Sequence, residues 1–281
     1  MQNKPLAYIL RGEFRNMPYV ILGPPGTRKT ATLVETILQI FRLVPGARLL
    51  VGTPSTSSAD VITTRLIENG VLKMGELIRL VSHKEIKKGL IPEHLMPYCA
   101  TGNKSWDTGL RYRSQDDIIV TESGLKVKCQ MKYLRRQRIT IGTCDTLGNL
   151  LQMRFPPNRF THMLIDDAGQ CTEPEIMVAV AQVSNERGQV ILVGNPNRQA
   201  AIINEYARQR GLSTSFLERI LSFAPYLQNF DHFPFACDCF NSRLVLRLLN
   251  DYRSLPAILN VYDELSIPTI TENSKEAEMR K

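Results

Sequence analysis

The sequence predicts an α/β fold in which a mostly parallel sheet is flanked by helices. Three observations predict it. Short apolar runs rich in β-formers alternate with helical patterns, as in sheets built from crossover units. A loop of the phosphate-binding type, Gly23–Thr30, follows the first of these runs. A pair of acids, Asp166 and Asp167, follows a later run, where the carboxyl end of a parallel strand faces a ligand.

Five short apolar runs are the strand candidates. They are Tyr19–Leu22, Arg48–Gly52, Arg138–Gly142, His162–Ile165 and Val190–Gly194. Between them, apolar residues from Leu33 to Phe41 recur at helical spacing, and helices are also expected over Ala59–Gly70 and Glu173–Val183. These elements give the strand–loop–helix order in which a phosphate-binding loop is expected.

Two segments depart from this alternation of strands and helices. Residues 78–137 are polar, basic and turn-rich, and we interpret them as an insertion between the second and third core strands. A new segment begins near residue 230, where Arg243–Asp251 is expected to be helical and the charged tail 271–281 to fray.

The phosphate loop departs from the pattern G-x-x-x-x-G-K-[ST] at one position. It reads Gly23-Pro24-Pro25-Gly26-Thr27-Arg28-Lys29-Thr30, with Arg28 where glycine is expected. Its backbone N–H groups would cradle an anion, Lys29 would reach the β- and γ-phosphates, and the Thr30 hydroxyl would bind Mg²⁺. The alternative is an ordinary Gly/Pro turn between a strand and a helix.

The acids at the end of His162–Ile165 complete the predicted chemistry. Asp166 stands where an aspartate would hold Mg²⁺, and Asp167 could accept a proton from an attacking water. Adjacent acids after a strand are also common in turns, so this signal depends on the phosphate loop upstream.

Composition sets the remaining bounds. The 281-residue chain has no stretch of eighteen apolar residues and no signal-peptide pattern, so we expect an intracellular protein that does not enter a membrane. Its six cysteines follow no disulfide framework. The net charge of +8 favours an anionic partner, and a local excess suggests contact with a nucleic-acid backbone, a solvated basic face being the alternative. That excess comprises Lys126, Lys128, Lys132, Arg135, Arg136 and Arg138.

The order of motifs resembles the first RecA-like domain of superfamily 1 RNA helicases, above all the Armitage type, which is related to senataxin. The resemblance covers roughly residues 2–265. Besides the phosphate loop and Asp166–Gln170, it rests on Thr53–Ala59, Ile141–Cys144, Cys171–Glu175, Gly194–Gln199 and Tyr252-Arg253-Ser254-Leu255-Pro256.

This resemblance implies ATP and Mg²⁺ as cofactors and single-stranded RNA as a partner. It assigns Gln2, the loop Gly23–Thr30 and Arg198 to ATP, and Thr30 and Asp166 to the metal. The catalytic residues it implies are Lys29, Asp166, Asp167 and Arg253. Its RNA-binding residues are Pro54, Ser55, Thr56, Thr143 and Cys144. It also implies a role in small-RNA silencing, with partners of the Argonaute/Piwi type, in the cytoplasm and its ribonucleoprotein granules.

The chain differs from the family wherever the γ-phosphate would be sensed or cleaved. Arg28 replaces a glycine and is expected to crowd the β-phosphate or change the loop dihedrals. Asp167 replaces a longer glutamate, and Arg198 replaces a glutamine. Asn195 and Leu255 replace a motif aspartate and a motif histidine.

The expected organisation is a first RecA-like domain over 1–228, containing the insertion 78–137, and the start of an incomplete second RecA-like domain over 229–281. The resemblance implies one of two functions. The first is the ATP-binding domain of an ATP-dependent RNA helicase. The alternative is a relative impaired by Arg28, Asp167, Arg198 and the missing second domain, which binds nucleotide, RNA or a silencing partner without unwinding. The motif order disfavours an unrelated enzyme such as a small kinase.

Overall fold

The computed structural model describes residues 3–12, 17–100, 118–120, 126–128, 136–152, 158–186, 188–200, 202, 204–233, 239–250 and 252. The predicted site residues Gln2 and Arg253 lie outside these ranges, as do Lys132, Arg135 and Leu255. Every other predicted site residue lies within them.

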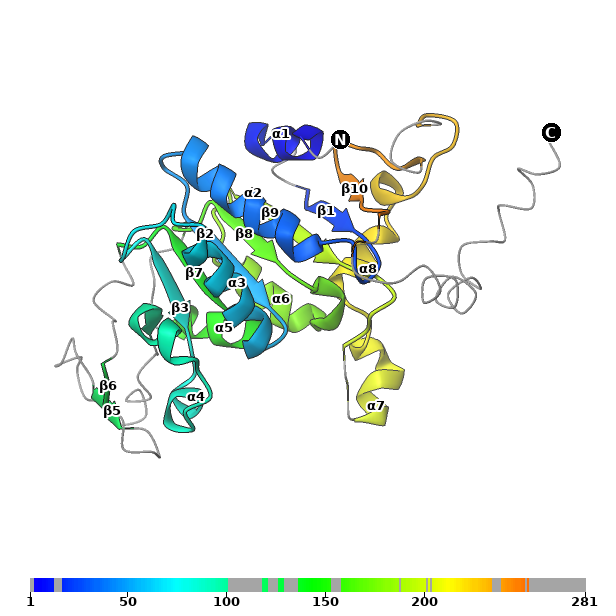
Figure 1. Cartoon of the computed structure of the whole chain (residues 1–281). Coiled ribbons are helices and arrows are strands. Elements are labelled where there is room, and N and C mark those ends of the chain that lie inside the picture. Colours follow the sequence, from blue (N-terminus) through cyan, green and yellow to red (C-terminus); the bar gives the residue numbers. More distant parts are fainter. Residues whose placement is uncertain are drawn as a thin grey trace.

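A parallel sheet of eight strands forms the centre of the molecule, in the order β10-β1-β9-β8-β2-β7-β3-β4 (Figure 1). Its strands are β1 Tyr19–Leu22, β2 Leu49–Thr53, β3 Leu77–Leu80, β4 Cys99–Ala100, β7 Ile139–Thr143, β8 His162–Ile165, β9 Gln189–Gly194 and β10 Val245–Arg247. A separate antiparallel pair joins β5 Ile118–Val120 to β6 Lys126–Lys128. The predicted α/β class with a parallel sheet is confirmed.

Helices cover both faces of this sheet, with α1, α2 and α3 on one face and α5, α6 and α8 on the other (Figure 1). The α-helices are α1 Asn3–Arg11, α2 Lys29–Leu43, α3 Thr56–Glu68, α4 His83–Lys87, α5 Cys144–Gln152, α6 Glu173–Val180, α7 Glu205–Ala207 and α8 Phe216–Leu221. Short 3₁₀ turns cover Glu93–Tyr98, Ala168–Gln170 and Ala224–Tyr226, and a π-helical turn covers Arg208–Leu212. Within the described part of the chain, no helix is both long and apolar enough to span a bilayer.

The strands are buried on both faces, which explains why they read as continuous apolar runs. In β1, Tyr19 and Ile21 belong to the core on the α2 side, whereas Val20 and Leu22 belong to the core on the α5 side. Successive side chains of a strand point to opposite faces, so a sheet covered by helices on both sides needs apolar residues throughout.

The predicted insertion 78–137 begins inside the sheet. Strand β3 pairs with β7 and β4, so the first part of that segment extends the sheet instead of interrupting it. A charge in the middle of β3 concealed this strand in the sequence. Arg79 is fully buried, and its Nε donates to Asp60 Oδ1 over 3.1 Å. The pairing allows a cation inside a buried strand.

The predicted helix over Arg243–Asp251 is wrong. Val245–Arg247 forms β10, which pairs in parallel with β1, and Val20 N donates to Leu244 O over 2.8 Å. The apolar run around it fits either a helix or a strand by periodicity, and the unpaired edge of β1 decides in favour of the strand. The sheet of the first predicted domain therefore extends past residue 228, into the range that the sequence assigned to a second domain.

Candidate functional site

The predicted site residues gather at the carboxyl edge of the sheet. The phosphate loop follows β1, the acids Asp166 and Asp167 follow β8, and Asn195 follows β9. Pro54 follows β2 and Cys144 follows β7. Because all strands in the sheet are parallel, these segments share one edge, which is where ligands bind in open α/β sheets.

The phosphate loop folds over its own carbonyl oxygen at Pro24. Thr27 Oγ1 and Lys29 Nζ each donate to Pro24 O over 2.9 Å. Gly23 is required at the base of the loop, because a Cβ atom there would lie 2.5 Å from Thr27 Oγ1. Helix α2 begins at Lys29 directly after the loop, so the positive end of its dipole faces the same space.

Arg28 has a backbone conformation that normally favours glycine. Its φ of 60° and ψ of 34° lie in the left-handed region, which glycine adopts without steric cost. The side chain is exposed, and its guanidinium carbon lies 4.3 Å from the ring centroid of Tyr252. In this conformation the guanidinium lies against Tyr252, and whether Arg28 crowds a bound phosphate stays a prediction.

A hydroxyl–carboxylate pair joins the loop to the end of β8. Thr30 Oγ1 donates to Asp166 Oδ2 over 2.8 Å, across 136 residues of sequence. Burial and the neighbouring charge of Asp167 raise the pKa of Asp166 from 3.8 to about 6, against the opposing effect of the Thr30 hydrogen bond. Asp166 is thus a buried acid whose charged form is only partly compensated by its hydrogen bonds.

The same two oxygens fit a magnesium ion. Mg²⁺ prefers oxygen ligands and is commonly bound by one or two carboxylates together with substrate phosphates. Thr30 and Asp166 would hold it, and a cation there would supply the missing compensation for the buried Asp166 charge. When bound, Mg²⁺ would neutralise charge on the β- and γ-phosphates.

Asp167 and Arg198, two of the substituted residues, form an ion pair. Arg198 Nη1 lies 3.8 Å from Asp167 Oδ2, and Asp167 has a left-handed backbone with φ 48°. The turn containing Arg198 packs closely against Gly169, where a Cβ atom would lie 2.6 Å from Arg198 O. The Arg198 guanidinium therefore lies beside the Asp167 carboxylate, which was predicted to activate water.

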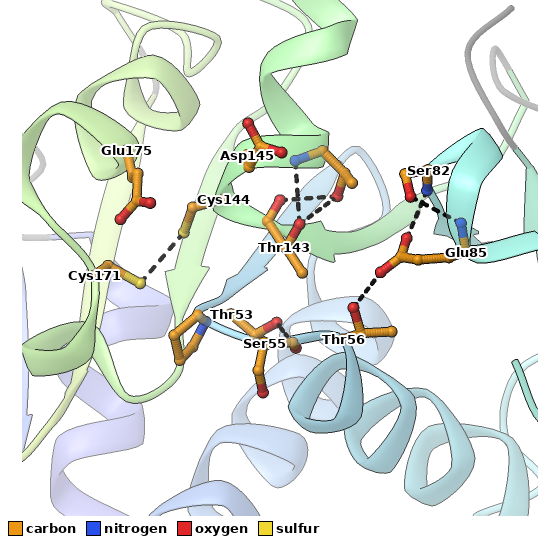
Figure 2. Close-up of a pocket in the computed structure, with 12 residues that line it drawn as sticks. Thr53, Ser55, Thr56, Ser82, Glu85, Thr143, Cys144, Asp145, Cys171 and Glu175 are labelled. Carbon is orange, nitrogen blue, oxygen red and sulfur yellow. Dashed lines mark hydrogen bonds between the residues drawn. The ribbon is translucent and has the colours of Figure 1, made fainter. Parts of the chain in front are cut away.

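All five predicted RNA-binding residues line one pocket of about 410 Å³ (Figure 2). They are Pro54, Ser55, Thr56, Thr143 and Cys144. Ser55 caps helix α3 by accepting a hydrogen bond from Ser58 N, and Thr143 Oγ1 accepts one from Thr146 N. The Ser55 and Thr143 hydroxyl groups can donate to phosphate or ribose oxygens, whereas Thr56 Oγ1 donates to Glu85.

The sequence did not predict the acidic part of the pocket, which Glu85, Asp145 and Glu175 form (Figure 2). Glu85 accepts hydrogen bonds from Thr56 Oγ1 and Ser82 N. Burial raises its pKa, but these hydrogen bonds outweigh burial and the net pKa is lowered. The pattern Ser82-x-x-Glu85 is a helix-capping box that could have indicated α4.

Cys144 is buried and faces a second thiol across the pocket wall. Its Sγ lies 3.7 Å from Cys171 Sγ, and both side chains are at most 2% exposed. The hydrogen bond with Cys144 and burial raise the pKa of the Cys171 thiol, which keeps it protonated. The two thiols therefore contribute packing between α5 and the acidic turn.

One member of the predicted basic cluster has a structural role. Arg138 donates from Nη2 to Phe41 O and Val44 O, each over 2.8 Å, and from Nε to Ala47 O over 3.2 Å. Its guanidinium also lies 4.1 Å from the ring centroid of Phe41. Arg138 therefore binds the carbonyl end of α2, whereas the exposed Arg136 is open to solvent.

A parallel sheet, a glycine loop before a helix and a hydroxyl–carboxylate pair together define a P-loop nucleotide-binding domain of the RecA-like class. Comparison with known proteins refines this. The AAA domain family matches residues 7–101. The chain is 47% identical to "Probable RNA helicase armi" of Drosophila melanogaster over 99% of the chain and 24% of that protein. It is 34% identical to mouse "RNA helicase Mov10l1" over 92% of the chain and 20% of that protein.

A solved structure, an arterivirus nonstructural protein 10 helicase in complex with DNA, matches with a TM-score of 0.44 and 14% identity, over 94% of this chain and 42% of that one. Over nearly its whole length the chain is homologous to one segment of Armitage-type RNA helicases. It spans about a fifth to a quarter of the length of the two named relatives.

Proposed function

We propose that this chain is the ATP-binding RecA-like domain of an ATP-dependent RNA helicase. The observation that carries the proposal is the Thr30–Asp166 hydrogen bond, which sets the predicted metal ligands 2.8 Å apart beneath the phosphate loop. Homology to a segment of RNA helicases supports the same activity. In this proposal Lys29 contacts the phosphates, and Asp167 and Arg253 serve the hydrolysis step.

Single-stranded RNA is the proposed nucleic-acid partner. Support comes from the pocket at the carboxyl ends of β2 and β7, where Ser55, Thr56 and Thr143 offer hydroxyl groups. The family resemblance extends the proposal to small-RNA silencing, with Argonaute/Piwi-type partners in cytoplasmic ribonucleoprotein granules. Co-purification of tagged chain with such partners, compared before and after RNase treatment, tests that extension. Absence of these partners from both samples would remove it.

A second candidate function is binding of nucleotide and RNA with little hydrolysis. It is favoured by the Asp167–Arg198 ion pair, because a carboxylate engaged by a guanidinium is a weaker base for the attacking water. The shorter side chain of Asp167 adds to the effect, since it withdraws the carboxylate by about one C–C bond, roughly 1.5 Å.

Phosphate release measured with and without single-stranded RNA separates these functions, with Lys29→Ala as the matched control. A helicase ATPase should release phosphate in an RNA-stimulated manner, and Lys29→Ala should abolish it. ATP binding by calorimetry without release above the control would favour the second function. Failure to bind ATP at any concentration tested would reject both nucleotide proposals.

A further inference from the structure

The segment that follows β10 contacts the phosphate loop at three backbone positions. Leu248 N donates to Leu22 O over 2.7 Å, and Tyr252 N donates to Gly26 O over 3.1 Å. Between them, Gly23 lies so close that a Cβ atom would be 3.1 Å from Leu248 O. The phosphate loop is therefore bounded on this side by the segment after β10, which lies more than 220 residues further along the chain.

Arg28 adds a side-chain contact to this boundary. The Arg28 guanidinium carbon lies over the ring of Tyr252, at 4.3 Å from the ring centroid. That separation is within the range of an attractive cation–π contact. Tyr252 is 51% exposed, so the stack forms on the surface of the site instead of in the core.

We propose that Tyr252 is a positioning residue that holds the Arg28 side chain away from the phosphate cradle. A loop of this type uses glycine where its backbone N–H groups must approach phosphate oxygens closely. An arginine at that position carries a long cation whose N–H donors can hydrogen-bond loop carbonyl groups and cover the cradle. Stacking on Tyr252 keeps the Arg28 guanidinium from occupying the place of the phosphate. The Tyr252–Gly26 backbone hydrogen bond fixes the ring beside the loop.

A double-mutant cycle tests this inference, which rests on the proposed nucleotide binding. Tyr252→Ala, Arg28→Gly and the double variant are titrated by calorimetry with ATP and with inorganic triphosphate, which has no base. Tyr252→Ala should weaken triphosphate binding by about fivefold, the scale of one exposed cation–π contact. In the Arg28→Gly background the same change should have little effect, and Tyr252→Phe, which keeps the ring, should bind as the parent does.

An equal loss of triphosphate affinity in both backgrounds would overturn the inference, because it would mean that Tyr252 acts independently of Arg28. A loss confined to ATP would also overturn it, since Tyr252 would then contact the base directly. Amide hydrogen exchange of residues 22–30 without ligand supplies a second readout. Exchange should change on Tyr252→Ala only when Arg28 is present. If no variant binds either ligand, the proposed function fails, whereas the exchange result still decides the Arg28–Tyr252 inference.

Discussion

At the residue scale, backbone strain marks the predicted nucleotide site. Among the described residues, four that are not glycine have positive φ, and Arg28 and Asp167 are two of them. Each lies directly beside a residue that was predicted to bind phosphate or metal, Lys29 and Asp166. Strained conformations of this kind persist where the surroundings fix them and concentrate at functional sites. The sequence identified both positions as substituted but contained no sign of their conformation.

The raised pKa of Asp166 predicts a pH-dependent gain in stability for Asp166→Asn. Because the folded pKa of about 6 exceeds the unfolded 3.8, the acid contributes stability below about pH 4 that is lost as pH rises through 6. Near pH 8 the variant should therefore be more stable than the parent by about 1–3 kcal/mol, and by less near pH 5. Urea unfolding at both pH values measures this. A gain of equal size at both, or one shared by the exposed Asp145→Asn, would contradict it.

The Asp167–Arg198 pair predicts a gain of hydrolysis when both residues are replaced. Asp167→Glu extends the carboxylate toward the water by about 1.5 Å, and Arg198→Gln removes the cation 3.8 Å from it. The double variant should raise RNA-stimulated phosphate release by about tenfold, since it recovers part of the roughly 10²–10⁴-fold effect of a positioned general base. Asp231→Glu adds the same methylene to an exposed acid outside the pocket and should leave the rate unchanged. A rate no higher than that of the parent would show that base strength is not limiting.

At the element scale, prediction from sequence succeeded where one interaction dominates a segment. β1 and β8 match the predicted runs residue for residue, because strands covered on both faces are uniformly apolar. β3 was missed because Arg79 interrupts the apolar pattern and Asp60, which neutralises it, comes from α3. β10 was missed because only the exposed edge of β1, a tertiary feature, selects a strand there. The acidic side of the pocket at the ends of β2 and β7 was also missed, because the tertiary fold brings Glu85 to it from α4.

The carbonyl contacts of Arg138 predict a loss of stability on Arg138→Ala. Its guanidinium binds the Phe41 and Val44 carbonyl oxygens at the end of α2, where carbonyl groups lack helical partners, and the Ala47 carbonyl in the turn that follows. We expect a loss of about 1–3 kcal/mol, typical for hydrogen bonds from a charged donor. The exposed neighbour substitution Arg136→Ala should cost less than about 0.5 kcal/mol. Urea unfolding of the two variants measures the difference, and equal values would mean that the Arg138 hydrogen bonds contribute nothing net.

At the scale of the whole molecule, two kinds of RNA contact are expected and they differ in their response to salt. The net charge of +8 and the basic cluster would act on the RNA backbone through release of counterions. Among the described residues, those lining the pocket at the ends of β2 and β7 carry hydroxyl and carboxylate groups and no cation. Hydrogen bonds from this pocket to ribose or base would depend little on ionic strength. The contributions of the basic cluster and of the pocket to RNA affinity can therefore be measured separately.

We predict that these contributions separate in titrations of fluorescent single-stranded RNA across a range of salt concentrations. Each phosphate that the protein no longer neutralises should reduce the slope of log affinity against log salt by about 0.7. Replacing Lys126, Lys128 and Arg136 by glutamine should therefore flatten the slope, whereas Thr143→Ala should lower affinity at every salt concentration and leave the slope unchanged. Thr32→Ala, at the start of α2, serves as a hydroxyl control away from the pocket. A slope near zero in the parent would eliminate the basic cluster as an RNA-binding surface. An unchanged affinity in Thr143→Ala would eliminate the pocket, because Thr143 lines it at the end of β7.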